Sequence, residues 1–425
     1  MNPWRGLREL PRGVWIVCAA MLVNRAGTMV LPFLVLYLSQ SRGIAPTRAA
    51  LALTVYGVAA MIAGPIAGRL CDRVGTIQVM KASLFASGAM LLVLPLAQTL
   101  TAILAMTAVW SFVSEAVRPA ALAAVAEQAS PGQRRAAFAL IRLAVNLGMS
   151  VGPAVGGFLA AVSFRALFWA DSVTSLLAGV VLVLWPLHVA GRAGSAAELL
   201  EEPADVARDI EAESATPPTA ALPSDLLGVL RDPRLVYFLL ALIPVLLVFF
   251  QISSALPLYL VQHRGLPESF FGLIFTLNTL LIVALEVPLN LAMAHWKHRH
   301  ALALGAMLYA AGFGALALVE QRAAILATVV IWTFGEMILL PASAAYIAEI
   351  APAGKQGECM GVYSMTFSLA FAVGPWLGAT VLQRFGPEVL WAATFVSGSL
   401  AALLMSRVRG SQEAEGGTGV ASTKK

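Results

Sequence analysis

LGMSVGPAVGG, residues 147–157, lies inside a long apolar segment of this chain. It holds four glycines, Gly148, Gly152, Gly156 and Gly157, around Pro153. Small residues spaced by four positions form a flat helical face, on which the backbone of a neighbouring helix can pack closely. Glycine and proline also let a membrane helix bend. The stretch therefore predicts a membrane helix that packs tightly against a neighbour and can bend.

The composition of the whole chain also indicates a membrane protein. Hydrophobic residues make up 59% and charged residues 12% of the 425 positions, whereas soluble proteins carry about 25% charged residues. So few charges could not cover the surfaces of two or three soluble domains. The three cysteines, Cys18, Cys71 and Cys359, show neither metal-ligand spacing nor a disulfide framework. We therefore expect no metal site and no cofactor.

Apolar runs of about 20 residues, the length that spans a bilayer, divide into two groups of six. The twelve predicted spans are 13–38, 49–70, 79–97, 100–128, 136–162, 165–188, 235–262, 269–295, 301–319, 322–349, 358–383 and 387–406. They predict an N-terminal six-helix bundle in residues 1–188 and a C-terminal six-helix bundle in residues 235–406. The polar, acidic stretch 189–234 is predicted to be a flexible cytoplasmic linker. Residues 407–425 are predicted to be a disordered cytoplasmic tail.

The distribution of Lys and Arg predicts the orientation in the membrane. Most of the 28 basic residues lie in segments on the same side as both termini, and such segments are typically cytoplasmic. We therefore expect a multi-pass, monomeric protein of the cell inner (plasma) membrane with both termini in the cytoplasm. The same bias accounts for the net charge of +5, so no nucleic-acid partner is expected.

The two groups of spans repeat one another at a constant offset of 222 residues. Trp110 corresponds to Trp332, and Gly152-Pro153 corresponds to Gly374-Pro375. Further pairs at the same offset run from the first span to the sixth: Tyr37 and Tyr259, Phe112 and Phe334, Pro119 and Pro341, Glu127 and Glu349, Gly156 and Gly378, and Trp169 and Trp391. This offset predicts two parallel halves related by an axis along the membrane normal, with a binding site at their interface.

A second motif follows the second span, where the chain from position 68 reads GRLCDRVGTIQVMK. Gly68, Asp72, Arg73 and Gly75 occupy the positions of the pattern G-x3-D-R-x-G. This pattern resembles the cytoplasmic loop signature of the major facilitator superfamily. Residues 148–157 resemble the G-x3-G-P-x2-G-G signature in the fifth helix of antiporters of that superfamily.

The resemblance is to the branch of twelve-helix drug:proton antiporters. It implies an all-α membrane protein with twelve transmembrane helices in two pseudo-symmetric six-helix bundles, the major facilitator fold. It also implies that Asp72 closes the cytoplasmic side by meeting a helix N-terminus and arginines such as Arg134. Two positions depart from the branch pattern: Ala139 replaces an earlier glycine, and Ala108 stands near the place of a fourth-helix arginine.

Ionisable residues inside membrane spans are costly and usually functional. Arg25, beside Asn24, lies in the first span, Glu115 and Arg118 lie in the fourth, and Glu336 lies in the tenth. The resemblance implies that these spans line the central cavity. A carboxylate in a poorly hydrated cavity can exchange protons near neutral pH and couple them to a substrate.

That chemistry makes Glu336 and Glu115 candidate proton-coupling or cation-binding groups. Alternatively, Glu115 pairs with Arg118 or Arg25 and stays ionised as a packing element. The two arginines either partner the acids or bind an anion. Asn24, Trp110 and Trp332 are further candidates for the substrate cavity, and Asp171 is predicted to form a structural ion pair with Arg165.

Two more buried charges suggest a conformational gate. Arg142 lies in the fifth span and Glu286 in the eighth, roughly 9–14 Å from the cytoplasmic ends at 1.5 Å per residue. The resemblance implies that these spans face each other across the halves. They are predicted either to form a cross-half ion pair that breaks during the cycle or to find partners within their own halves. The gate prediction also includes Asp72, Arg73, Pro153 and the glycines of both motifs.

The predicted function is secondary active transport by alternating access, most simply the proton-coupled efflux of lipophilic or cationic small molecules. No phosphate-binding loop and no catalytic constellation is present in the sequence, so we expect no ATP-driven step and no enzyme. The partners would be a small-molecule substrate, protons and the lipid bilayer. Two alternatives are a transporter of an anionic metabolite or lysophospholipid, and a non-transporting membrane sensor or assembly protein.

Overall fold

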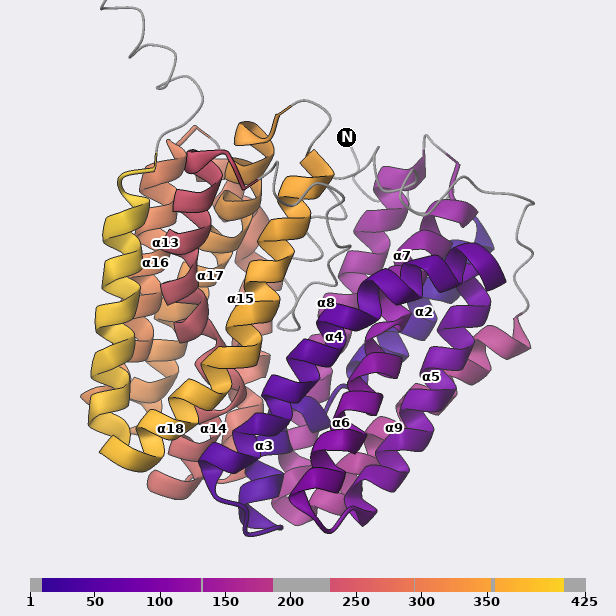
Figure 1. The fold of residues 1–425 in the computed structure, drawn as a ribbon, viewed down its shortest axis with the longest axis horizontal. Coiled ribbons are helices and arrows are strands. Elements are labelled where there is room, and N and C mark those ends of the chain that lie inside the picture. The colour runs from indigo at the N-terminus through magenta and orange to yellow at the C-terminus, as the bar shows by residue number, and fades with distance from the viewer. Residues whose placement is uncertain (1–9, 131–132, 186–229, 294, 353–355, 409–425) are drawn as a thin grey trace, which may run out of the picture.

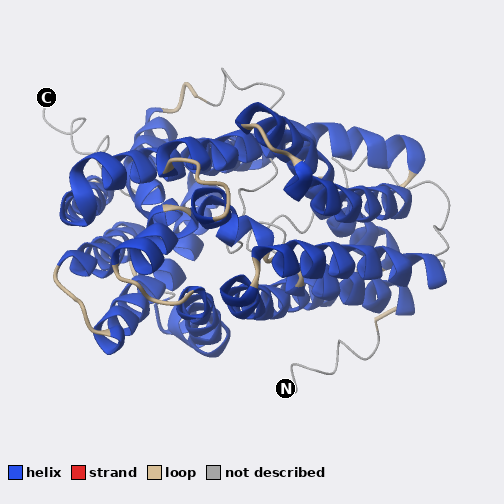
Figure 2. Ribbon diagram, turned by 90° about the horizontal axis from the view of Figure 1, so that it is seen from below, coloured by secondary structure: helices blue, strands red, loops and turns tan. Residues whose placement is uncertain are grey.

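The computed structural model describes residues 10–130, 133–185, 230–293, 295–352 and 356–408 (Figure 1). All the regular elements among them are helices (Figure 2). Most of the predicted linker 189–234 and of the predicted tail 407–425 lies outside the described residues.

The first half is a bundle of consecutive helices joined by short connections. They are α2 (Arg12–Ala26), α3 (Val30–Gln40), α4 (Pro46–Val74), α5 (Thr76–Val93), the short η1 (Leu94–Leu96), α6 (Leu100–Glu115), α7 (Val117–Gln128), α8 (Arg134–Val162) and α9 (Phe164–Leu184). The second half follows the same order. It contains α13 (Pro233–Phe249), η3 (Phe250–Ser253), α14 (Ala255–Leu258), η4 (Tyr259–His263), α15 (Glu268–Met293), α16 (His298–Gly314), η5 (Ala315–Ala317), α17 (Arg322–Ile350) and α18 (Gln356–Met405).

Eleven helical segments among the described residues are long and apolar enough to span a membrane. The last of them, Glu358–Met405, is interrupted at Gly386, where φ is +85°. A glycine tolerates this left-handed conformation because it lacks a Cβ atom. The interruption divides the segment into two, and twelve spans result. The predicted all-α architecture of two six-helix bundles is confirmed (Figure 1).

The offset of 222 residues reappears in the bounds of the helices. The segment Leu100–Gln128, which covers α6 and α7, corresponds exactly in position to α17, and α4 and α5 begin at positions equivalent to the starts of α15 and α16. The loops before α4 and α15 each contain a left-handed glycine, Gly43 with φ of 63° and Gly265 with φ of 62°. The two halves therefore share their local structure as well as their sequence pattern.

The first span is interrupted, although the sequence predicts a continuous helix there. α2 ends at Ala26 and α3 begins at Val30. The backbone N–H groups of Met29 and Val30 donate hydrogen bonds of 3.1 and 2.9 Å to Asp171 Oδ2 in α9. A carboxylate satisfies the free N–H groups at a helix start and complements its dipole. Asp171 therefore caps α3, and the predicted ion pair with Arg165 is wrong.

The seventh span is interrupted at the equivalent place. α13 gives way to the tight turn η3, and Ser254 has a φ of −141° before α14 begins. Pro257 lacks an N–H group and so cannot donate to the carbonyl one helical turn earlier. At the same interruption, Ser254 Oγ donates a hydrogen bond of 2.8 Å to the Pro375 carbonyl of α18. Both interrupted spans are thus supported by a neighbouring helix.

The glycines of the 147–157 motif lie directly against the interruption of the first span. A Cβ atom at Gly148 would come within 2.8 Å of the backbone nitrogen of Ala26. At Gly152 it would come within 3.0 Å of the carbonyl oxygen of Arg25. Real Cβ atoms hardly ever approach backbone atoms so closely. The motif therefore has glycine at these positions because α8 and the end of α2 are in backbone contact.

Most of the contact between the halves comes from two pairs of long helices, α8 with α15 and α4 with α18, and α3 also contacts η3 and α14. The halves are closest at the end where the loop containing Gly43 lies, which we call the Gly43 end. There the Cβ position of Gly157 lies 3.0 Å from the Cα atom of Gly272, and Thr47 Oγ1 donates a hydrogen bond of 2.7 Å to Gln383. The loop containing Gly75 marks the opposite end, the Gly75 end.

The halves diverge toward the Gly75 end. Gly57 and Gly68 lie about three turns apart on one face of α4. A Cβ atom at Gly57 would contact Phe371 and Ala372 of α18, whereas a Cβ atom at Gly68 would find no atom within 4 Å. The structure is therefore closed at the Gly43 end and more open at the Gly75 end.

Replacing Asp171 with alanine should lower the thermal unfolding midpoint of the purified protein. Two buried N–H groups would lose their acceptor, and such a loss costs about 1–3 kcal/mol. The matched control is Arg165→Ala, which removes an exposed side chain with no contact to Asp171 and should leave the midpoint unchanged. Equal midpoints for Asp171→Ala and the wild type would contradict the capping role.

Candidate functional site

A cavity with a volume of about 430 Å³ lies in the second half. It is enclosed by α15, α16 and α17 and is bordered by one residue of α8. Its polar lining residues are Arg142, Glu286, Asn290, His298 and Glu336. The rest of the lining is mainly apolar. The size falls within the range of about 300–1,000 Å³ that is typical of small-molecule sites.

Glu336 contributes a buried carboxylate to this cavity. Its side chain is only 7% exposed and lies in the middle of α17. Asn278 Nδ2 in α15 donates a hydrogen bond of 2.9 Å to Glu336 Oε2 and another of 3.1 Å to Thr333 Oγ1. The amide thereby holds the carboxylate at one orientation. Asn278 was not singled out from the sequence, although it lies 222 positions after Tyr56, which has the equivalent role in the first half.

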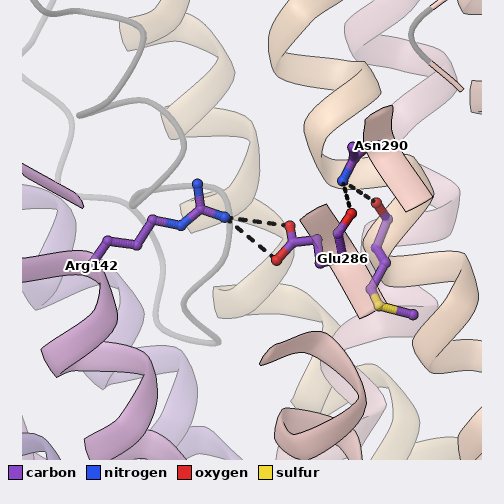
Figure 3. Close-up of polar contacts among 4 residues, drawn as sticks. Arg142, Glu286 and Asn290 are labelled. Atoms are coloured by element: carbon purple, nitrogen blue, oxygen red, sulfur yellow. Dashed lines mark hydrogen bonds and ion pairs between the residues drawn. The ribbon is translucent and has the colours of Figure 1, made fainter. Parts of the chain in front are cut away.

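Arg142 and Glu286 meet across the two halves at the border of the cavity (Figure 3). Arg142 Nη2 lies 3.5 and 3.4 Å from the two carboxylate oxygens of Glu286. Close charge-assisted hydrogen bonds measure about 2.7–2.9 Å, so this pair is long. Asn290 lies one turn after Glu286 and donates to the Glu286 carbonyl oxygen at 3.0 Å. Of the two predicted arrangements, the structure has the cross-half pair.

The first half places Glu115 in a different environment from Glu336. Tyr56 Oη donates a hydrogen bond of 2.6 Å to Glu115 Oε1, and Oε2 has no hydrogen-bond partner among the described residues. α6 ends at Glu115 and α7 begins only at Val117. This interruption separates Glu115 from Arg118, and the predicted ion pair of Glu115 with an arginine is not formed among the described residues.

Arg25 and Arg118 lie together at a second, much smaller cavity of about 10 Å³ between α2, α7 and α8. Both side chains are buried, with 7% and 5% exposure. Asn24, the neighbour of Arg25, instead donates a hydrogen bond of 3.3 Å to Ser175 Oγ. The structure thus separates these basic residues from the large cavity that contains Glu336.

The two tryptophans proposed for the substrate cavity lie in packed interiors. Trp110 Nε1 donates a hydrogen bond of 3.2 Å to Ser87 Oγ, and its ring lies 5.2 Å from that of Tyr56. Trp332 is 1% exposed and packs 5.5 Å from the ring of Phe313. Neither tryptophan lines the cavities described above.

The residues of the cytoplasmic loop motif lie at the Gly75 end. Asp72 and Arg73 are both exposed at the end of α4, and Gly75 has a φ of +92° at the turn into α5. The left-handed conformation explains the glycine at this position. The open space beside Gly68 leaves its side of α4 free to approach α18. A gating role for the four residues remains a prediction.

Equivalent helix ends are joined in both halves at the Gly75 end. Thr76 Oγ1 donates a hydrogen bond of 2.7 Å to Glu127 Oε2. At the positions 222 residues later, His298 Nε2 lies 2.8 Å from Glu349 Oε2. The sequence repeat contains the glutamate pair but not its partners, since a threonine and a histidine share no obvious pattern.

Comparison with known proteins places this architecture in a family. The model of the Major Facilitator Superfamily matches residues 16–271 and 252–422. The chain belongs to the major facilitator superfamily. It is therefore a multi-pass membrane transporter and not an enzyme, and proteins of this superfamily bind small-molecule substrates.

The relatives cover nearly the whole chain. The uncharacterized MFS-type transporter YttB of Bacillus subtilis is 25% identical over 90% of this chain and 91% of its own length. Multidrug resistance protein 1 of the same organism is 24% identical over 77% of this chain and 79% of its own length. Among solved structures, the peptide transporter POT in complex with sulfate covers 95% of this chain and 94% of its own, with a TM-score of 0.73 and 19% identity. That structure shares the fold alone.

Reversing one charge of the Arg142–Glu286 pair should impair transport. Either Arg142→Glu or Glu286→Arg brings two like charges together at the border of the cavity, and we expect a loss of at least about tenfold, or about 1.4 kcal/mol. The double exchange restores opposite charges and should recover much of the rate. Transport by reconstituted vesicles measures this. An absence of mutual rescue would contradict a functional pair.

Proposed function

We propose that this transporter exports lipophilic or cationic small molecules in exchange for protons, by alternating access of a cavity between its two halves. The observation that carries the proposal is the buried carboxylate of Glu336 in a mainly apolar cavity of drug-like size. Apolar walls favour a lipophilic compound, and a carboxylate favours either a proton or a cation.

Glu336 would bind the proton and the substrate in turn. In the conformation open at the Gly75 end, which we take to be cytoplasmic, a cationic substrate displaces the proton from the carboxylate. After the halves rock, the substrate leaves at the Gly43 end and a proton from outside replaces it. Asn278 keeps its hydrogen bond to Glu336 Oε2 in this scheme and so keeps the carboxylate in the same orientation.

The Arg142–Glu286 pair would act as a weak latch in this conformation. The side chain of Glu286 is 9% exposed and that of Arg142 is 26% exposed. Their long contact provides a smaller gain than a close, buried pair would, so it can break at modest cost when the helices move. Near the Gly43 end, the backbone contact of Gly157 and Gly272 would close the site in this conformation and would separate when the substrate leaves there.

Export of an anionic metabolite or lysophospholipid is the less favoured function. A substrate anion would be expected to meet basic side chains in the large cavity. The basic residues that line that cavity are Arg142 and His298, and Arg142 already contacts Glu286. Arg25 and Arg118 line a different cavity of about 10 Å³, which is too small for such a substrate. The relative named as a multidrug resistance protein also supports the export of lipophilic compounds.

The substitution Glu336→Gln should abolish substrate-driven proton movement. Proteoliposomes with an imposed pH gradient and a pH-sensitive dye report protons released when lipophilic cations are added. Glutamine has the same size but cannot carry the exchanged proton. The control is Glu320→Gln, because the Glu320 side chain is 79% exposed and pairs with Arg264 away from the cavity. Full coupling in Glu336→Gln would overturn the assignment of Glu336.

A leucine at Gly68 should slow transport without destabilising the conformation described here. The Cβ position has open space around it. The free energy of unfolding should therefore change by no more than about 0.5 kcal/mol, and the thermal midpoint should change little. Closing the Gly75 end would bring α18 onto this face of α4, and a bulky side chain would obstruct that approach. Gly68→Ala should have a smaller effect on uptake into vesicles. A wild-type transport rate in Gly68→Leu would exclude this closing motion.

A further inference from the structure

We propose that the cavity between Arg25 and Arg118 is a binding site for a small monovalent anion, of the size of chloride. The site is separate from the large cavity, because no residue lines both. It does not depend on which compound is transported, and its test requires no transport.

The first argument is the unsatisfied charge of Arg25. Its side chain is 7% exposed, its Nε atom is buried without a hydrogen-bond partner, and its guanidinium makes no ion pair with any described residue. Arginine does not deprotonate in proteins, so the charge cannot be removed by losing a proton. A buried charge that no counter-charge contacts costs several kcal/mol. An anion in contact with the guanidinium would offset this cost.

The carboxylates of the same half do not contact the Arg25 guanidinium. Asp171 Oδ2 accepts the two backbone hydrogen bonds at the start of α3 and interacts with Arg25 only over a longer distance. Glu115 Oε1 accepts from Tyr56, and its Oε2 atom is buried without a hydrogen-bond partner among the described residues. Neither carboxylate makes a hydrogen bond or close ion pair with Arg25, although all three lie in the same half.

The backbone of α8 lies against the base of the Arg25 side chain. The Cβ position of Gly148 lies 2.6 Å from the Arg25 Cβ atom, so any side chain at position 148 would collide with it. The glycine motif therefore has a second consequence, since it leaves room for a buried charged residue in the interior of the first half.

The cavity itself selects the ligand. Its two basic lining residues come from α2 and α7, and the remaining ones are apolar: Met21, Ala121, Leu122, Ile141 and Val145. A volume of about 10 Å³ admits roughly one water-sized group. A halide, or one oxygen of a carboxylate, fits this space between two guanidinium groups, whereas sulfate and phosphate are too large. Enclosure within one half favours the free halide.

The purified full-length protein in detergent provides the test. Chloride or bromide replaces gluconate at constant ionic strength, and the thermal midpoint should rise saturably by about 2–4 °C. Sulfate should produce no such shift, and radioactive chloride should bind at one site. Arg25→Gln and Arg118→Gln should lose both responses. The control Arg165→Gln removes an exposed arginine of the same half and should keep both.

A third variant protects the test against misfolding of the arginine variants. Ala121→Val fills the cavity while both arginines stay, and it should also lose the halide response. Absence of chloride binding in the wild type would overturn the proposal, as would equal binding in all the variants. A midpoint shift with acetate but none with chloride would overturn the assignment to a free halide and would assign the two arginines to a carboxylate-bearing compound.

Discussion

The close approach of one backbone to another at the interrupted spans is the constraint on which the rest of the structure depends. α8 has glycine where it meets the backbone at the end of α2, and α18 has Gly378 where it meets the Gln251 side chain beside the equivalent interruption. A side chain at Gly148 or Gly152 would push α8 away from α2, and one at Gly378 would displace the Gln251 side chain. At the first interruption, two backbone N–H groups donate to Asp171 of α9, and at the second, the Ser254 hydroxyl donates to the Pro375 carbonyl of α18. Discontinuous helices of this kind form binding sites in many transporters.

The two ends of the molecule differ in the kind of contact that joins the halves. Near the Gly43 end the halves meet through backbone at Gly157 and Gly272, and toward the Gly75 end they are joined by the long side chains of Arg142 and Glu286. Side chains of that length can separate and find water, whereas a close-packed backbone contact resists separation. This gradient explains why the conformation described here is closed at the Gly43 end and more open at the Gly75 end.

The two halves share a plan but differ in chemistry. Asn278 and Tyr56 occupy equivalent positions and each holds a glutamate, Glu336 in one half and Glu115 in the other. The repeat in the sequence predicted equivalent helices, and it could have indicated Asn278. Periodicity could not show that Glu336 borders a large cavity while Glu115 lies beside an interruption of its helix. The partner of Asp171 was predicted wrongly for the same reason, because the start of α3 approaches it only after distant segments fold together.

The amino-acid sequence was sufficient to predict the membrane spans, the repeat and the close packing at Gly148 and Gly152. These follow from hydrophobicity, spacing and the absence of a Cβ atom, all of which are properties of neighbouring residues. The burial of Glu336 in a cavity, the cross-half contact of Arg142 with Glu286 and the isolation of Arg25 were decided by the tertiary structure. Each depends on which atoms of distant helices are brought within a few ångströms, and electrostatic and hydrogen-bonding energies change steeply over that range.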